Sequence, residues 1–471
     1  MAERVGIERI GVYAPPWRLG PEHFERAWGT RVRATRAVAG HDEDTLTMAL
    51  EAAGVAGAEA ERERIDGLYF AATRAPYAEK GAAATIATAL DLRGDLFAGD
   101  FVGTLRGGTQ ALRAAWDAVR AGSARAVLVA TSDLRLVEPG NATETTLGDG
   151  AAAVVVGTHD PLAEIVASHS TVEDFADNWR LDGETYLREA DAKFIGEYGY
   201  PRILGEAIDA LLAKAGVTKD AVAQVAVCAP DVRGHALLEK RLGFDANRVS
   251  GTEALARLGY TGNAAEFIAL VDALSKARAG EWVVLAGFGS GADAFLLRAT
   301  DAVERRRAEL DLANVLEGGV AVPSYERYLQ WRGILPTERI DPFTSLPVLW
   351  REQRDLLRRY AKRCGACGAI QFPPRRICWN CSVADRMEDH RLGRFGTVRT
   401  FTRDHLVPVP ADAVGMIAAD LEGGGRFYGQ YTDGDPKEIE VGMPVELVLR
   451  RLHTGGGLIH YFWKLRKRRE G

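Results

Sequence analysis

The chain has 471 residues, of which 47% are hydrophobic and 26% are charged, and its formal net charge is −6. This length exceeds one ordinary core and predicts two or three globular domains, while the small acidic excess argues against a protein dominated by nucleic-acid contacts. No apolar run approaches the roughly 20 residues of a membrane span, and charges stand where a signal peptide would be apolar, so we expect a soluble, cytoplasmic protein.

Residues 1–300 alternate β-branched apolar runs with Ala- and Leu-rich stretches of helical period. The expected strands lie at residues 124–133, 151–158, 224–230 and 281–291. The expected helices, at residues 109–122 and 265–280, each end at a glycine suited to a helix C-terminus. This alternation predicts an α/β fold around a largely parallel, buried sheet.

One succession of elements occurs twice. A Gly-rich turn, a long Ala-rich helix and a hydrophobic strand follow one another around residues 103–133 and again around residues 259–291. Because one supersecondary unit is used twice in the same order, we expect a duplicated α/β unit.

The character of the sequence changes from Leu349 onwards. Prolines in residues 336–347 predict a connector, and residues 348–363 have the pattern of a basic amphipathic helix. Short alternating segments broken by Gly, Pro and Asp follow, at residues 396–407, 414–422, 426–434, 444–452 and 458–468. This pattern predicts a small antiparallel barrel.

Four of the five cysteines form a metal-ligand motif. Cys364, Cys367, Cys378 and Cys381 have the spacing C-x2-C-x10-C-x2-C, and two such pairs supply the closed tetrahedral sulfur set that zinc favours. We therefore expect a structural Zn²⁺, with an iron site or metal-free thiols as the alternatives. The fifth, Cys228, stands alone, and a lone cysteine at a strand end is often a packing residue.

The first 340 residues resemble the HMG-CoA synthases of the archaeal and bacterial type, which belong to the thiolase superfamily. The resemblance rests on blocks in conserved order: IGVYAPPWRL, PYAEKGAAATIATAL, GGTQAL, GDGAAAVVVG, DFADNWR, KFIGEYGYP and GFGSGADAF. It implies a duplicated thiolase-like fold layered α/β/α/β/α, a coenzyme A or acyl-carrier thioester as substrate, and a homodimer.

The remainder resembles the zinc-ribbon/OB-fold proteins that accompany such enzymes as separate chains. The resemblance implies a thiolase-like domain at 1–340, a connector helix and zinc ribbon at 341–385 and an OB-fold domain at 386–471. It also implies that the OB domain contacts a partner enzyme. The barrel lacks the interleaved aromatics of a single-strand nucleic-acid site, and we expect neither nucleic acid nor membrane as a partner.

The residues at the synthases' catalytic positions differ here. Leu105, four residues before the Thr of GGT, stands where the resemblance places the nucleophilic cysteine. Thr73 or Arg74 stands near the position of the glutamate, and Cys228 replaces the histidine. Tyr260 replaces an asparagine of the second half. Leucine cannot be acylated, so ordinary synthase activity is not expected.

Two interpretations of these substitutions remain open. In the first, other groups perform carbon–carbon chemistry or acyl transfer, as in the steroid side-chain aldolases, which the chain resembles in lacking the nucleophile. The candidate catalytic residues are Cys228, Tyr260 and Arg74, and the candidate substrate-binding residues are Tyr77, Asp231 and His235. Tyr260 would donate to, or remove a proton from, a β-hydroxyl or enolate oxygen if its pKa were lowered. Arg74 would hold a carboxylate or phosphate by its planar fork. In a third variant, Cys228 would accept an acyl group and transfer it to another acceptor. In the second interpretation, the protein is a non-catalytic subunit that binds acyl thioesters within a multienzyme complex.

Overall fold

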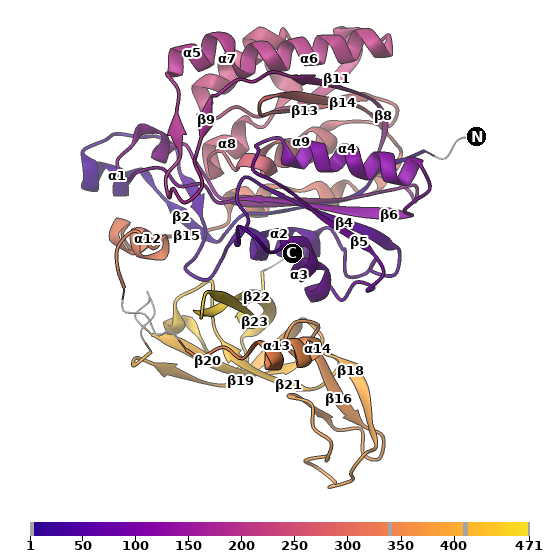
Figure 1. Ribbon diagram of the computed structural model, residues 1–471, viewed down its shortest axis with the longest axis vertical. Helices are drawn as coiled ribbons and strands as arrows, with labels where there is room; N and C mark the ends of the chain where they lie inside the picture. Colours follow the sequence, from indigo (N-terminus) through magenta and orange to yellow (C-terminus); the bar gives the residue numbers. More distant parts are fainter. Residues whose placement is uncertain (1–3, 338–341, 408–412, 470–471) are drawn as a thin grey trace. The chain divides into compact units, whose positions relative to one another are not determined.

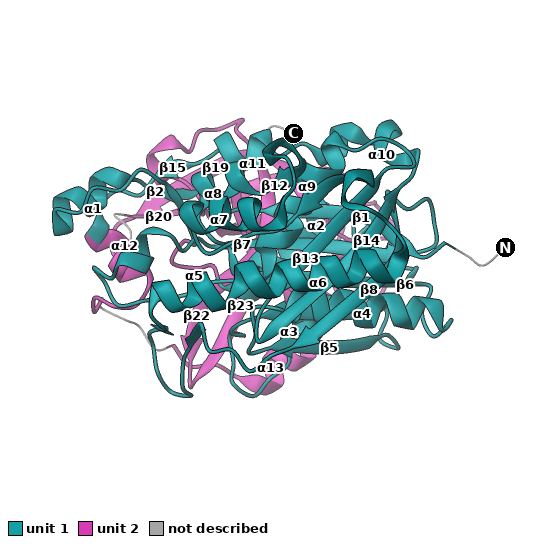
Figure 2. Ribbon diagram, turned by 90° about the horizontal axis from the view of Figure 1, so that it is seen from above, with its two compact units in different colours: residues 1–39, 44–325 teal, residues 40–43, 326–471 magenta. Residues whose placement is uncertain are grey.

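The computed structural model describes residues 4–337, 342–407 and 413–469. The chain divides into two compact units, unit 1 with residues 1–39 and 44–325 and unit 2 with residues 40–43 and 326–471 (Figure 2). The domain boundary expected at residues 340–341 lies outside the described residues, and the one expected at 385–386 stays a prediction. Among the described helices, none is long and apolar enough to span a membrane.

A ten-stranded mixed sheet forms the centre of unit 1 in its described residues (Figure 1). Its order is β12-β11-β13-β14-β8-β1-β7-β6-β4-β5. The strands are β1 (Gly6–Tyr13), β4 (Ile65–Ala72), β5 (Phe97–Val102), β6 (Ala126–Asp133), β7 (Gly150–Gly157), β8 (Ala163–Val172), β11 (Val222–Ala226), β12 (Val249–Ser250), β13 (Trp282–Phe288) and β14 (Gly291–Ala299).

The sheet is less parallel than the sequence predicts. Strand β5 pairs with β4, and β4 with β6, in parallel, but β6 pairs with β7 antiparallel. The connection from β13 to β14 has only the two residues 289–290, and such a turn permits only antiparallel pairing. The expectation of a largely parallel sheet is therefore wrong, although the strands expected at 124–133, 151–158 and 281–291 are confirmed.

The two halves of the sheet have the same construction. From the outer edge inwards, β5-β4-β6-β7-β1 and β12-β11-β13-β14-β8 each pair parallel, parallel, antiparallel and antiparallel. The halves join where Gly6 and Ile7 of β1 pair with Glu164 and Ala163 of β8. This equivalence confirms the duplication expected from residues 103–133 and 259–291.

Two helices lie between the halves, and others cover the outer faces (Figure 1). The inner helices are α4 (Gly107–Arg120), which packs on β4 and β6, and α9 (Ala265–Lys276), which packs on β11 and β13. Unit 1 also contains α1 (Pro21–Trp28), α2 (Thr45–Val55), α3 (Ala82–Ala89), α5 (Ala192–Tyr198), α6 (Tyr200–Ala215), α7 (Val232–Leu242), α8 (Thr252–Leu258), α10 (Ala302–Arg305), α11 (Ala313–Glu317), β2 (Trp17–Leu19), β3 (Arg36–Val38), β9 (Asn178–Trp179), β10 (Arg188–Glu189) and β15 (Val320–Ala321). Helix α4 begins near the ends of β4 and β6, and α9 begins near the ends of β11 and β13. The first turns of both helices therefore lie at the candidate site.

The prediction of one continuous helix at residues 348–363 is wrong. After α12 (Tyr325–Trp331), the described chain has two short helices, α13 (Leu346–Arg351) and α14 (Gln353–Leu356), and then strand β16 (Tyr360–Cys364). Arg359 has a φ of 64°, which ends the helical path. Its side chain is buried and lies 4.4 Å from the centroid of the Trp463 ring, so packing outweighs the helical pattern.

The described part of unit 2 contains two antiparallel sheets. The smaller has the order β17-β16-β18, with β17 at Ile370–Gln371 and β18 at Met387–Arg391. The larger has the order β21-β20-β19-β22-β23, with β19 (Phe395–Asp404), β20 (Val414–Leu421), β21 (Arg426–Gln430), β22 (Pro444–Gly455) and β23 (Leu458–Lys467). A bridge between Tyr431 and Leu465 links the ends of this order, and all five strands expected from the sequence are present.

Candidate functional site

Three of the residues expected at catalytic positions, Leu105, Cys228 and Tyr260, meet in one buried cluster of unit 1. Leu105 precedes α4, Cys228 follows β11 and Tyr260 precedes α9. These side chains pack together with Val137, Leu147, Leu255 and Ala265, and each is at most 7% exposed. Tyr260 is fixed by its backbone, which donates to the Thr146 carbonyl and accepts from Gly148 N–H. We name the residues Leu105, Cys228 and Tyr260, with Glu266 described below, the core site.

The environment of Cys228 favours its neutral thiol. Burial raises the pKa of Cys228, and the neighbouring Glu266 raises it further. The Sγ atom lies 3.6 Å from the carbonyl of Ala229. Because the thiolate is the reactive form of cysteine, this position does not provide an activated nucleophile.

Tyr260 is also held in its neutral form. Burial raises the pKa of Tyr260, Glu266 and Cys228 raise it further, and Arg135 opposes them weakly. The guanidinium carbon of Arg135 lies 5.9 Å from the ring centroid. The lowered pKa required of a tyrosine base is therefore contradicted, and the phenol is suited to donate a hydrogen bond.

Glu266 is a member of the site that the sequence did not reveal. It lies in the first turn of α9, is 2% exposed and interacts electrostatically with both Cys228 and Tyr260. Burial raises the pKa of Glu266 to about 8, with a smaller contribution from Asp133. No other described side chain donates a hydrogen bond to its carboxyl group. A carboxyl group with this pKa can exchange a proton near neutral pH.

A signal for Glu266 was present in its helix. Residues 265–280 are otherwise apolar through the first turns, and a helix that is apolar on all sides is buried. A glutamate in the first turn of such a helix must be buried too, which marks it as a candidate acid.

Asp133 fixes the loops around the core site. Its Oδ1 accepts hydrogen bonds from Thr73 N and Oγ1, both at 2.6 Å. Its Oδ2 accepts from the backbone and side-chain nitrogens of Asn263 at 2.7 and 2.9 Å. Asn263 in turn accepts from Gly108 N–H at 2.8 Å. This network joins the end of β4 to the starts of α4 and α9, so Asp133 positions the site.

Gly262 permits this arrangement. It has a φ of +59°, and a Cβ there would lie 2.2 Å from Asp133 Oδ2. Any other residue would displace the carboxylate that holds Asn263.

The remaining expected site residues have separate environments. Arg74 is exposed beyond β4, and Tyr77 is half-buried, with Lys80 Nζ 5.2 Å from its ring centroid. Asp231 caps α7 by accepting from Gly234 N–H at 2.8 Å. His235 is fully buried in α7, where burial lowers its pKa, and its Nε2 lies 3.6 Å from Glu239 Oε1. The catalytic role expected of Arg74 and the substrate-binding roles expected of Tyr77, Asp231 and His235 stay predictions.

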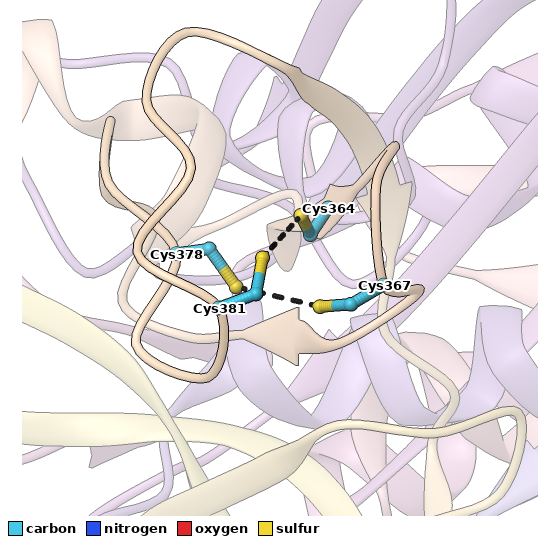
Figure 3. A group of neighbouring side chains, drawn as sticks. All are labelled: Cys364, Cys367, Cys378 and Cys381. Atoms are coloured by element: carbon cyan, nitrogen blue, oxygen red, sulfur yellow. Dashed lines mark hydrogen bonds between the residues drawn. The ribbon is translucent and has the colours of Figure 1, made fainter.

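The four clustered cysteines converge in unit 2 (Figure 3). Their sulfur atoms all lie within 4.8 Å of one another, and the pairs Cys364–Cys381 and Cys367–Cys378 are each 3.6 Å apart. Four sulfurs bonded to one ion at about 2.3 Å in a tetrahedron are about 3.8 Å apart. The arrangement therefore suits a metal ion.

The chain is similar in sequence to known proteins. Residues 100–173 match the family model for 3-oxoacyl-[acyl-carrier-protein (ACP)] synthase III. The hydroxymethylglutaryl-CoA synthase of Archaeoglobus fulgidus is 30% identical over 340 residues, which cover 70% of this chain and 98% of that protein. The synthase of Pyrococcus horikoshii is 32% identical over 311 residues, covering 64% and 89%.

Solved structures show the same fold. An HMG-CoA synthase complexed with CoA matches with a TM-score of 0.64 at 18% identity, covering 73% of this chain and 94% of that one. A 3-oxoacyl-(acyl carrier protein) synthase III from Pseudomonas aeruginosa matches with a TM-score of 0.57 at 22% identity, covering 63% and 98%. These likenesses confirm the mixed α/β, thiolase-like fold of the larger part of the chain.

We expect the Glu266→Gln variant to become more stable relative to the wild type as the pH rises. The folded pKa of Glu266, about 8, exceeds its ordinary value of 4.5. Between these values the folded carboxyl holds a proton that the unfolded chain has released, so wild-type stability falls with pH. The difference in unfolding free energy between variant and wild type should grow by up to about 1.4 kcal/mol per pH unit.

Urea unfolding at several pH values between about 5 and about 8 measures this difference. Glu253→Gln is the matched control, because Glu253 is exposed in the first turn of α8. A pH-independent difference for Glu266→Gln would contradict the raised pKa.

Proposed function

Because this chain belongs to the hydroxymethylglutaryl-CoA synthase family, we propose that it makes or breaks a carbon–carbon bond in an acyl-CoA or acyl-carrier thioester without forming an acyl-enzyme. The observation that carries the proposal is the buried, titratable Glu266 beside Cys228 and Tyr260; the expected place of Leu105 at the nucleophile's position supports it. Aldol-type chemistry needs an acid–base group and support for an enolate, but it needs no nucleophilic side chain.

In the cleavage direction, the carboxylate of Glu266 accepts the proton of a β-hydroxyl group. The Cα–Cβ bond then breaks, a carbonyl forms at Cβ, and the electron pair moves through Cα to the thioester oxygen as an enolate. The neutral Tyr260 phenol donates a hydrogen bond to this oxygen, which disperses its charge in a site from which water is largely excluded. Return of the proton to Cα gives the shortened thioester and regenerates the carboxylate. Condensation is the same sequence reversed.

The raised pKa values support this division of roles. Glu266 releases its proton near pH 8, whereas Cys228 and Tyr260 keep theirs. A general base works best when its pKa is near the working pH. Only Glu266 in the core site has this property, so acyl transfer through Cys228 is the less favoured variant.

Incubation with a panel of β-hydroxyacyl-CoA thioesters tests the proposal, with the shortened thioester and the released carbonyl compound measured by mass spectrometry. We expect cleavage whose rate rises with pH towards about 8, because Glu266 must lose its proton. Glu266→Gln should lower the rate by about 10²- to 10⁴-fold. Cys228→Ser should keep most of the activity.

Failure of the whole panel in both directions, with CoA thioesters still bound, would replace this proposal by the non-catalytic binding subunit. Loss of activity in Cys228→Ser but not in Glu266→Gln would instead indicate acyl transfer through the thiol.

For unit 2, we propose a zinc ribbon followed by an OB-fold barrel. The tetrahedral spacing of the four sulfurs and the absence of any other ligand type among them support zinc. The strand order β21-β20-β19-β22-β23, with Tyr431 bridging to Leu465, supports a closed five-stranded barrel. Zinc there would stabilise a segment with little core of its own.

Metal analysis of the purified protein should give one zinc per chain. Cys381→Ser should lose the metal and lower the melting temperature, because the ion contributes to folding. Ser382→Ala is a control beside the site. A full iron complement, or stability unchanged by metal removal, would contradict a structural zinc.

We further propose a homodimer that pairs through β5. This strand ends the sheet order, and its Phe97 and Val102 are 67% and 48% exposed. An unpaired, apolar edge strand favours pairing with another strand. Light scattering should give twice the chain mass for the wild type and a smaller mass for Phe97→Glu, whereas a monomeric wild type would contradict the dimer.

A further inference from the structure

The four clustered cysteines of unit 2 differ in their exposure. Cys364 and Cys378 are buried, each with 1% of its surface exposed, whereas Cys367 and Cys381 are exposed. Each C-x2-C pair therefore consists of a buried first cysteine and an exposed second one. A closed tetrahedral metal site uses its four sulfurs alike, so metal binding alone does not require this alternation.

The shortest sulfur contacts join a buried cysteine to an exposed one. The Sγ atoms of Cys364 and Cys381 are 3.6 Å apart, and those of Cys367 and Cys378 are also 3.6 Å apart (Figure 3). Both contacts cross from one C-x2-C pair to the other. The sulfurs of a disulfide are about 2.05 Å apart, so a small movement would close each contact. We name Cys364–Cys381 and Cys367–Cys378 the cross pairs.

Each cross pair has the two features of a redox-sensitive thiol pair. A metal-bound cysteine is held as a thiolate, which is the form that attacks an oxidant. The exposed members, Cys367 and Cys381, are accessible to a dissolved oxidant. Redox-sensor cysteines are accessible and stand beside a second, resolving cysteine, and the buried member of each cross pair occupies that second place.

Cys228 lacks both features and provides an internal comparison. It is buried in unit 1, and the residues of that unit contain no other cysteine. Burial in apolar surroundings makes a cysteine inert. A dissolved oxidant should therefore distinguish the cross pairs from Cys228.

We propose that the ribbon of unit 2 is a redox switch, in which a hydroperoxide converts the two cross pairs into disulfides and the zinc ion is released. This inference rests on the zinc ribbon proposed above. It gives the alternation of exposed and buried cysteines a purpose, because each exposed sulfur reacts first and its buried partner completes the bond.

The electrons and atoms balance with hydrogen peroxide as the oxidant. The exposed thiolate attacks one peroxide oxygen, so that an S–O bond forms, the O–O bond breaks and hydroxide leaves. The buried thiolate then attacks the resulting sulfenic acid, so that the S–S bond forms, the S–O bond breaks and a second hydroxide leaves. Each cross pair loses two electrons, and the two hydroxides take up protons to become water.

The oxidised ribbon remains cross-linked. The two disulfides join the same pair of C-x2-C segments that a metal ion would join, but their sulfurs are no longer the thiolates that zinc requires. The switch therefore changes the metal content of the ribbon and leaves its segments connected. A dithiol reductant should restore the four thiols by exchange, and added zinc should then bind again.

Treatment of the full-length, zinc-loaded protein with one equivalent of hydrogen peroxide for each cross pair tests the proposal. Zinc release is followed with a chromogenic chelator, and the cysteines are then alkylated and mapped by peptide mass spectrometry without reduction. We expect the loss of one zinc per chain, a metal-free mass lower by four hydrogen atoms, and disulfides at Cys364–Cys381 and Cys367–Cys378. Cys228 should be found alkylated.

Cys378→Ser removes the resolving partner of Cys367. In this variant we expect Cys367 to remain a sulfenic acid that dimedone traps, or to proceed to the sulfinic acid, while Cys364–Cys381 still closes. Ser382→Ala is the matched control beside the site and should close both cross pairs. If Cys378→Ser does not fold, the disulfide map of the wild type decides the proposal.

Disulfides within the C-x2-C pairs, sulfinic acids without cross-pair disulfides, or oxidation of Cys228 as fast as that of the cluster would overturn the switch. Zinc measured before the peroxide is added separates this inference from the ribbon on which it rests. Bound zinc without cross-pair disulfides would keep the ribbon and reject the switch. Isolated protein without zinc would reject the metal site, and with it the release step of the switch.

Discussion

The proposed chemistry depends on the removal of water from three ionisable side chains, Cys228, Tyr260 and Glu266, around the start of α9. Burial penalises the charged form of every acid, so Cys228 remains a thiol and Tyr260 a phenol, while Glu266 titrates near pH 8. Glu266 also raises the pKa of both Cys228 and Tyr260, because a second negative charge would be unfavourable there. The core site can therefore lose one proton near neutral pH, and that proton comes from Glu266.

Asp133 and Glu266 illustrate how two buried carboxyl groups acquire different roles. Asp133 accepts four hydrogen bonds from Thr73 and Asn263, and these fix the chain segments that frame the site. Glu266 has no such set of donors among the described side chains. A carboxylate held by many donors is suited to positioning, whereas one with few donors is free to exchange a proton.

The sequence predicted those parts of the structure that depend on local pattern. The repeated turn, helix and strand at residues 103–133 and 259–291 indicated the duplication, and motif spacing predicted that Leu105, Cys228 and Tyr260 stand at the family's catalytic positions. The convergence of these three side chains depends on long-range packing, which the sequence alone did not establish. The helical pattern at residues 348–363 was misleading, because the helix ends at Leu356 and Arg359, with a φ of 64°, packs on Trp463.

Protonation states were the least predictable feature. The direction of the Tyr260 shift requires its burial and its neighbours, neither of which a single sequence provides. Glu266 was overlooked because a polar residue in a helix is usually assigned to the solvent side.

The most direct test is the intact mass of the protein after incubation with acyl-CoA thioesters that include a β-hydroxyacyl member. The account predicts an unmodified chain together with a shortened CoA thioester in solution, because no activated nucleophile stands at Leu105 or Cys228. A covalent acyl adduct that maps to Cys228 would contradict it.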